Sequence, residues 1–96
     1  MNMPNVRVFD ADFLDRLTAE AAATPRRRKN FNLHASDDYP CHRFFNAMCA
    51  DTYVAPHRHA DAAKDESLVL LRGTLGVVIF DEQGQVVLAR RLQAGQ

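Results

Sequence analysis

The stretch His57-Arg58-His59, followed by Glu66, decides the fold of this chain. Alternate side chains of a β-strand lie on the same face, so the imidazoles of His57 and His59 would point into one space. The carboxylate of Glu66, on the next strand, can meet them there. Two neutral imidazoles and a carboxylate suit a borderline divalent metal such as Fe, Mn, Ni or Zn. The stretch therefore predicts a metal pocket inside a β-barrel, with coordination positions left open for a substrate.

The residues around this stretch have the composition and alternation of β-strands. We expect strands at residues 30–34, 42–49, 52–59, 66–71, 74–80 and 85–90. Residues 66–71 and 74–80 would form a hairpin about Arg72-Gly73, and Asp81 to Gly84 would form the next turn, with the glycine at positive φ. Short strands joined by tight turns predict an antiparallel β-barrel or one half of a β-sandwich.

One segment before the strands has the pattern of a helix, from Asp10 to Ala23. Apolar side chains recur there at helical spacing, at Phe13, Leu14, Leu17 and Ala21. Asp10 or Asp12 can cap its start, and Thr24-Pro25 ends it. We expect this helix to pack its apolar stripe on the outside of the barrel.

The composition predicts one globular domain over residues 1–96, with a helical segment at 1–24 and the β-barrel at 25–96. Of the 96 residues, 47% are hydrophobic and 25% are charged, which is ordinary for a soluble protein. The formal net charge is zero, so no overall charge favours nucleic acid or a membrane surface. No apolar run is long enough to span a bilayer, and residues 1–10 lack the pattern of a signal peptide. We therefore expect a cytoplasmic protein.

Several motifs together carry a family resemblance. They are His57-x-His59 with Glu66 and Gly73, Pro25-Arg26-Arg27-Arg28, Asn32-Leu33-His34, Asn46-Ala47-Met48, Leu71-Arg72-Gly73-Thr74-Leu75-Gly76 and Phe80-Asp81-Glu82-Gln83-Gly84. In these residues the chain resembles the cupin superfamily, and more narrowly the WbuC-type cupin fold metalloproteins. The resemblance implies a jelly-roll barrel and one divalent transition metal on His57, His59 and Glu66. It also implies a sugar or related anionic ligand, because WbuC-like proteins are associated with surface-polysaccharide gene clusters.

The chain departs from the general cupin pattern in two places. Residues 60–65 make a longer gap between the second histidine and Glu66 than most cupins have. Cupins also close their site with a second motif that contains a Pro-x-Gly turn and a third histidine, and this sequence reaches Gln96 before that motif. Two alternatives follow: a shortened chain, or a site without the usual fourth ligand.

Two further residues are candidates for a catalytic role. His34 lies in the alternation Asn32-x-His34, so it could enter the pocket as a general base or as a replacement ligand, with Asn32 on its face. The alternative is an ordinary polar strand residue, and the same two interpretations apply to His42. Tyr53 precedes His57 on the same side and could reach the site with its hydroxyl, or could be a plain core aromatic.

A basic run and two cysteines have competing interpretations. Arg26, Arg27 and Arg28 could form an anion clamp at the mouth of the barrel, because guanidinium groups suit phosphate or carboxylate. The alternative is a solvated connection between helix and strand. We expect Cys41 and Cys49 to be reduced thiols that pack as small hydrophobes.

These observations predict a metal-dependent protein that binds a small molecule, and they leave open whether it is an enzyme. One alternative is a non-catalytic ligand-binding or sensing module. Another is a metal-free sugar isomerase or epimerase in which a pocket histidine acts as the base. Because the expected strands leave open sheet edges, we also expect a homodimer.

Overall fold

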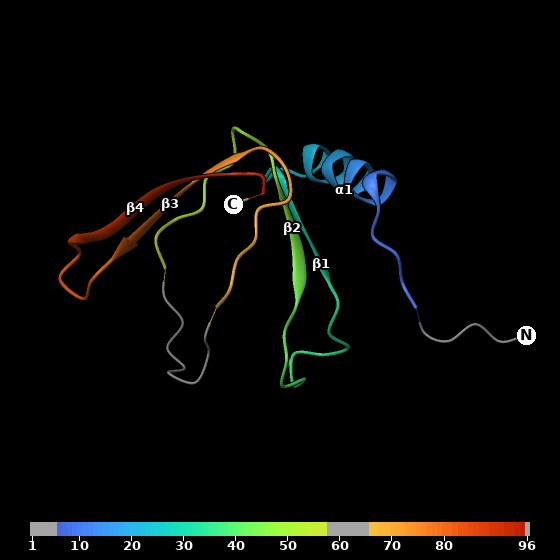
Figure 1. Ribbon diagram of the computed structural model, residues 1–96, viewed down its shortest axis with the longest axis horizontal. Coiled ribbons are helices and arrows are strands. Elements are labelled where there is room, and N and C mark those ends of the chain that lie inside the picture. The colour runs from blue at the N-terminus through green and yellow to red at the C-terminus, as the bar shows by residue number, and fades with distance from the viewer. Residues whose placement is uncertain (1–5, 58–65, 96) are drawn as a thin grey trace, which may run out of the picture. The chain divides into compact units, whose positions relative to one another are not determined.

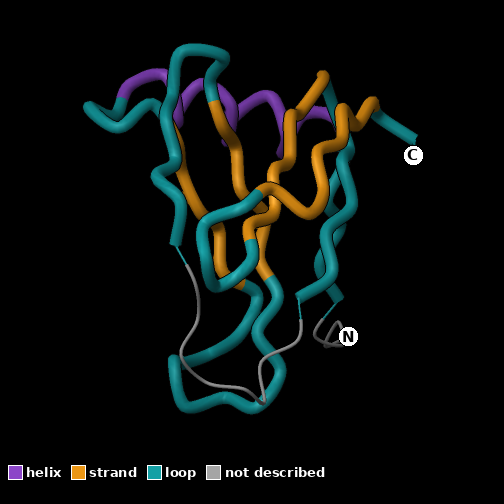
Figure 2. The backbone as a smooth tube through the Cα atoms, turned by 90° about the vertical axis from the view of Figure 1, so that its left-hand side faces the viewer, coloured by secondary structure: helices purple, strands orange, loops and turns teal. Residues whose placement is uncertain are grey.

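The computed structural model describes residues 6–57 and 66–95. They form helix α1 (Ala11–Ala23) and four strands, β1 (Arg28–Asn32), β2 (Phe44–Met48), β3 (Thr74–Phe80) and β4 (Val86–Gln93) (Figure 1). Loops connect these elements over much of the chain, drawn in teal in Figure 2. The chain divides into two compact units, Met1–Pro56 and His57–Gln96, and each is described by itself. The described fold consists mainly of small antiparallel sheets with one helix.

Helix α1 begins and ends where local chemistry predicts. The side chain of Asp10 accepts a hydrogen bond from the Phe13 amide at 3.0 Å, which satisfies one of the unpaired donors of the first turn. At the other end the Thr24 hydroxyl donates to the Ala21 carbonyl at 2.9 Å, before Pro25. The predicted apolar stripe is confirmed, since Leu17 and Ala21 are only 4% and 1% exposed.

Strands β1 and β2 form an antiparallel hairpin that pairs Arg28 with Met48 and Asn32 with Phe44. Backbone hydrogen bonds continue the pairing beyond both ends, from the Cys49 amide to the Arg27 carbonyl and from the Leu33 amide to the Arg43 carbonyl. Both bonds are made by odd-numbered residues that flank β1. The even-numbered residues therefore occupy the pairs without hydrogen bonds, in which opposing side chains come closest.

Helix α1 covers one face of the β1–β2 hairpin through an aromatic cluster. Phe13 lies 5.0 Å from Phe31 and 5.1 Å from Phe45 between ring centroids, and Phe9 lies 4.8 Å from both Phe13 and Phe45. Most of these pairs are edge-to-face, an arrangement that aromatic quadrupoles favour. The expected packing of the helix on the outside of a sheet is thus present, although the sheet has two strands.

Strands β3 and β4 form the second antiparallel hairpin, which pairs Leu75 with Leu92 and Ile79 with Leu88. The predicted turn is confirmed: the Asp81 carboxylate accepts from the amides of Gln83 and Gln85 at 2.9 and 2.8 Å. Gly84 has φ of +79°, as predicted. The last strand runs further than expected, to Gln93, because it pairs with the whole of β3.

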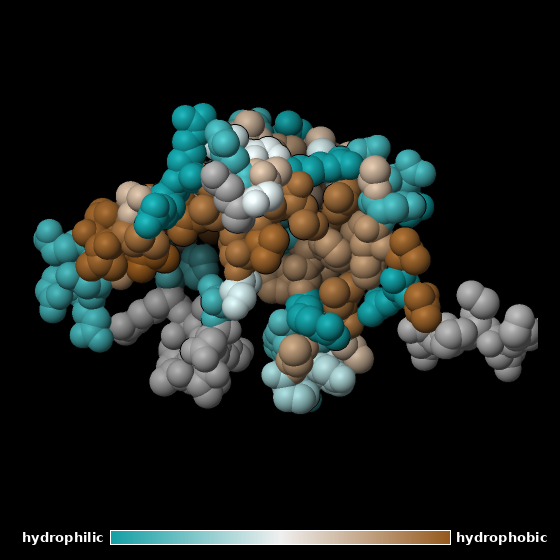
Figure 3. All heavy atoms as spheres, in the orientation of Figure 1, coloured by the Kyte–Doolittle hydropathy of each residue, from teal (hydrophilic) through white to brown (hydrophobic). Residues whose placement is uncertain are grey.

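Apolar side chains are exposed along the β3–β4 hairpin, on both of its faces. Brown side chains gather over this hairpin in Figure 3. Val78 and Phe80 on one face and Ile79 and Leu88 on the other are each 41–48% exposed. Neither strand pairs with a third strand among the described residues, so both edges of this sheet are open.

The sequence-based expectations were wrong in three places. Residues 66–71 are not a strand, and the expected hairpin about Arg72-Gly73 does not form, although Gly73 does have φ of +80°. Residues 74–80 instead pair with β4, because the Asp81–Gly84 turn brings the two runs together locally. Residues 52–57 are not a strand either, and residues 58–59 lie outside the described residues. In the described part of the chain the strands form two separate two-stranded sheets, and neither closes into a barrel.

No helix of the described residues is long and apolar enough to cross a membrane.

Candidate functional site

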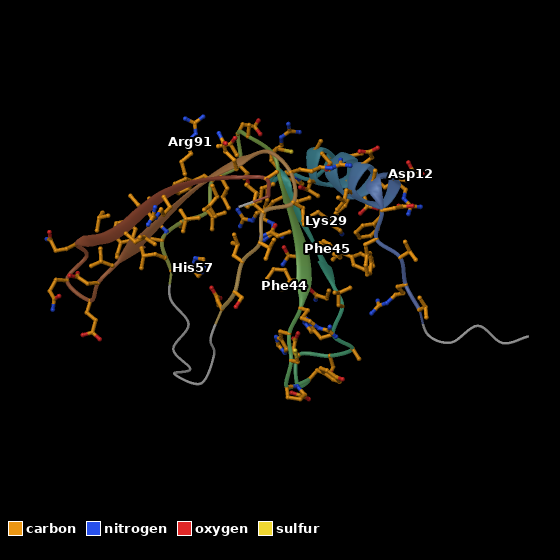
Figure 4. All side chains as sticks on the ribbon, in the orientation of Figure 1. Asp12, Lys29, Phe44, Phe45, His57 and Arg91 are labelled. Carbon is orange, nitrogen blue, oxygen red and sulfur yellow. The ribbon has the colours of Figure 1, made fainter. Side chains whose placement is uncertain are left out.

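The face of the β1–β2 hairpin that points away from helix α1 is polar. Phe31 and Phe45 turn toward the helix, so by alternation Asn30, Asn32 and Asn46 lie on the opposite face. Figure 4 shows the adjacent Phe44 and Phe45 on opposite sides of β2. Phe44 is 51% exposed on the polar face. A row of amide side chains with one exposed aromatic ring suits a small polar ligand better than a buried core.

Two histidines stack at the end of this polar face. The register that pairs Asn32 with Phe44 and Leu33 with Arg43 places His34 opposite His42. Their ring centroids are 4.1 Å apart and their planes differ by 3°. This pair occupies a position without backbone hydrogen bonds, where opposing side chains are closest, and that position explains the stack.

Hydrogen bonds to backbone carbonyls orient both rings. Nδ1 of His34 lies 3.2 Å from the Arg43 carbonyl, and Nε2 of His42 lies 2.8 Å from the Asp37 carbonyl. A carbonyl oxygen can only accept, so each of these nitrogens carries the proton when the ring is neutral. The other nitrogen of each ring, Nε2 of His34 and Nδ1 of His42, then holds a lone pair that can bind a cation or accept a proton.

The predicted metal ligands lie at the start of the second unit. His57, labelled in Figure 4, and Glu66 are both exposed. His59 lies outside the described residues, as does Arg58, so the set of His57, His59 and Glu66 stays a prediction. Within residues 6–57 and 66–95 no group of three or more His, Cys, Asp or Glu side chains is placed to hold a metal ion.

Tyr53 is not a core aromatic. Its side chain is 76% exposed, and its backbone carbonyl accepts a hydrogen bond from the Arg28 guanidinium at 2.8 Å. The interpretation of Tyr53 as a buried packing residue is therefore wrong. Its hydroxyl is open to solvent, which is compatible with the catalytic interpretation without testing it.

The predicted anion clamp is largely engaged with the protein's own acceptors. Arg27 pairs with Asp51 at 3.1 Å and also donates to the Ala22 carbonyl at the end of α1. Its hydrogen bond with Asp51, and then the charge of that carboxylate, raise the pKa of Arg27 above its ordinary value. Arg27 also adopts positive φ, at 61°, where the chain turns from α1 into β1. Arg27 and Arg28 thus tie the helix–strand connection to residues 51–53.

Arg26, the remaining arginine of the run, contributes its backbone to the connection between α1 and β1. The Arg26 carbonyl accepts from the Thr52 hydroxyl at 2.6 Å, which adds to the same connection.

Cys41 and Cys49 are both free thiols. Cys49 is half-buried, but Cys41 is exposed, so only Cys49 can pack as the small hydrophobe that was expected.

A hollow lies on the helix side of the first unit. It has a volume of about 430 Å³. Its lining combines aromatic rings with charged side chains: Arg7, Val8, Phe9, Phe13, Arg16, Leu17, Glu20 and Phe31. The Arg7 guanidinium lies 5.8 Å from the centre of the Phe9 ring, a cation–π contact that fixes one side of the hollow.

Sequence reasoning considered His34 and His42 separately and missed that they form a pair. The signal was available in the hairpin: once Asn32 is opposite Phe44, two further steps along each strand bring the histidines face to face. What sequence could not supply was that register, because the length and shape of the loop at residues 35–41 decide it.

Comparison with known families gives one match. A family model described as "Domain of unknown function (DUF6016)" matches residues 9–92. No curated protein and no solved structure matches the chain.

Proposed function

Since the chain belongs to the DUF6016 family, whose function is unknown, we propose a function from its own residues: a cupin-type metalloprotein that binds one divalent transition metal and a small polar molecule. His57, His59 and Glu66 would hold the metal. The observation that carries the proposal is the exposure of His57 and Glu66, whose imidazole and carboxylate are accessible rather than taken into a core. Two nitrogens and one oxygen fit Fe, Mn, Ni or Zn by donor chemistry.

The proposed ligand is a sugar or a related anionic metabolite. When bound, the metal would supply open coordination positions and Lewis acidity toward an oxygen atom of such a ligand. Separately, the first unit offers amide side chains that can hydrogen-bond sugar hydroxyls, at Asn30, Asn32 and Asn46 on the polar face of β1–β2. A protein that converts the bound molecule chemically would be an enzyme, and one that only binds it would be a sensing module.

A metal-free isomerase or epimerase is the second candidate, and one observation favours it. Nδ1 of His34 donates to the Arg43 carbonyl, so Nε2 is unprotonated in the neutral ring and can accept a proton from a substrate. Asn32 lies on the same face of the strand and could orient a sugar hydroxyl.

Elemental analysis of natively purified protein tests the first proposal. We expect close to one equivalent of Fe, Mn, Ni or Zn per chain, and a sharp loss of that metal in the variant His57→Ala. Arg58→Ala is the matched control, because a guanidinium group has no lone pair with which to bind a metal. Protein that contains no metal and regains none on soaking would rule the site out and favour the metal-free candidate.

We also propose that a second copy of the chain covers the β3–β4 hairpin. A two-stranded sheet is only marginally stable by itself, and this one exposes apolar side chains on both faces and two unpaired edges within the described residues. Exposed apolar patches of this kind mark interaction sites. An identical hairpin offers both a complementary edge and a complementary face, and we expect such a homodimer to bury on the order of 1,000 Å² or more.

A further inference from the structure

The stacked histidines of the β1–β2 hairpin have the features of a metal site that is separate from the one proposed above. We propose that His34 and His42 together bind one divalent transition cation, of the group Cu²⁺, Ni²⁺ and Zn²⁺. The proposal does not depend on His57, His59 or Glu66. It rests on three observations, namely the distance between the rings, the hydrogen bonds that orient them, and the charge of the loop that joins them.

The first observation is that the two rings are direct neighbours, so side-chain rotation alone can bring them to one cation. Their centroids are 4.1 Å apart in nearly parallel planes. Two imidazole nitrogens on one tetrahedral metal lie about 3 Å apart, because each metal–nitrogen bond is about 2.0–2.1 Å long. The lone pair of an imidazole lies in the ring plane, so the two rings must turn out of their parallel stack before Nε2 of His34 and Nδ1 of His42 can face the same cation. His42 is exposed and His34 partly so, and a cation in solution can therefore reach the pair.

The second observation is that each ring has its other nitrogen occupied by a backbone carbonyl. Metal-binding histidines generally donate their remaining N–H to such an acceptor, which fixes the tautomer and makes the ligating nitrogen more basic. His34 donates from Nδ1 to the Arg43 carbonyl, and His42 from Nε2 to the Asp37 carbonyl. Both neutral rings consequently present a lone pair that no proton occupies, which suits a cation and does not suit an anion.

The third observation is the charge of the connecting loop. Residues 35–41 contain Asp37 and Asp38 and no Lys or Arg. Two basic residues are near the pair. Arg43 is opposite Leu33, and by alternation its side chain lies on the other face of the hairpin, while the Arg7 guanidinium donates to the Leu33 carbonyl at 3.3 Å. The two carboxylates of the loop favour a cation over an anion at this end of the hairpin.

The ligand count decides what kind of metal site this is. The described residues include no third His, Cys, Asp or Glu placed to complete a metal site, so the pair supplies two protein ligands and leaves the other positions to water or a small molecule. Such a site is open rather than structural. Two imidazoles favour Cu²⁺ most, then Ni²⁺ and Zn²⁺, in the usual order of affinities.

The test uses the full chain in the variant His57→Ala, in which the other proposed site has lost a ligand. Chelator-treated protein is titrated with Cu²⁺, Ni²⁺ or Zn²⁺ by calorimetry. We expect one equivalent to bind, and the melting temperature to rise with metal concentration, because the cation would cross-link the two strands only in the folded state.

Matched substitutions remove the lone pair and keep the hydrogen bond. His42→Gln retains an N–H at the position of Nε2 for the Asp37 carbonyl, and His34→Asn retains one at the position of Nδ1 for Arg43. In the His57→Ala background we expect either change to weaken binding tenfold or more, since a cation held by two ligands loses its chelate. Thr18→Ala, at an exposed position of α1, should leave affinity unchanged.

Nuclear magnetic resonance gives a second readout that does not depend on folding effects of the substitutions. With Zn²⁺, the ring signals of His34 and His42 should change together over the same equivalent of metal. Rings that respond at different metal concentrations, or binding that survives both His34→Asn and His42→Gln, would overturn the shared site. If instead His57→Ala and the unsubstituted chain bind the same single equivalent, and His42→Gln abolishes it, the histidine pair stands and the His57 site fails.

Discussion

The two hairpins of this chain are both antiparallel pairs of strands, but they differ in which of their faces are covered by other side chains. The β1–β2 hairpin has one face covered by α1 through Phe9, Phe13, Phe31 and Phe45, and its other face is polar. The β3–β4 hairpin carries apolar side chains on both faces, with one arginine on each, and these apolar side chains are 41–61% exposed at Val78–Phe80 and Val86–Leu88. Strand pairing alone therefore does not make a stable layer. The two hairpins differ in whether another element of the same unit supplies covering side chains.

This comparison has a functional consequence. When one face of a hairpin is packed against a helix, the opposite face can carry polar side chains that bind a ligand. On β1–β2 that opposite face carries the asparagines and the stacked histidines. The β3–β4 hairpin has no comparable polar row. Its exposed apolar side chains are typical of an interface, which is why the proposed assembly involves the second hairpin and the proposed histidine site involves the first.

The largest expected effect is on the free energy of unfolding, and it should differ between substitutions on the two faces of β2. Phe45→Ala removes a ring that contacts Phe9 and Phe13, and we expect it to lower the free energy of unfolding by roughly 2–3 kcal/mol, somewhat less than a fully buried Phe. Phe44→Ala, one residue away on the polar face, should change it by only about 0.5 kcal/mol. Urea titration of both variants measures the difference. Equal losses would mean that both faces are covered and would remove the contrast between the hairpins.

The next effect concerns the proposed dimer. Val78→Lys places a charge on an apolar face of β3–β4, and we expect it to weaken self-association tenfold or more, since burying that charge is unfavourable. Light scattering at micromolar concentration should show the mass fall toward one chain. Gln83→Lys, in the turn, is the matched control for added charge. A wild-type mass of one chain, in folded protein, would contradict the dimer directly.

A smaller effect tests the turn that defines the second hairpin. Gly84 has φ of +79°, and an alanine there would cost roughly 1–2 kcal/mol, because its Cβ would crowd the following carbonyl. Gly76→Ala is the control, because Gly76 does not have positive φ and nothing lies near an added Cβ. Chemical unfolding of the two variants should separate them. A neutral result at Gly84 would mean that the turn relaxes at no cost.

The smallest effect is expected at the exposed ion pair of the first unit. Asp51→Asn removes the charge that Arg27 contacts at 3.1 Å, and it should lower the melting temperature slightly at low salt. At high salt, where surface charges are screened, the variant and the parent should melt together. A loss that persists in high salt would show that the contact acts through hydrogen bonding at the α1–β1 connection rather than through charge.

Local chemistry in the sequence determined the parts of this fold that need only neighbouring residues. The helix with its Asp10 cap and Thr24 end, and the Asp81–Gly84 turn, are set by contacts within about five positions along the chain. The strand at Thr74–Phe80 was predictable for the same reason, from its own run of β-branched residues.

Tertiary structure alone decided which strands pair and which side chains meet. Residues 68–71 and 86–89 are both apolar runs that flank β3 in the sequence, and their patterns do not distinguish the true partner, because a pattern of period two fits either neighbour. The register of β1 with β2 brought His34 to His42, and it tied Arg27 and Arg28 to residues 51–53 rather than leaving them as a free anion clamp. Contacts across such distances along the chain depend on loop closure and packing, which residue patterns do not encode.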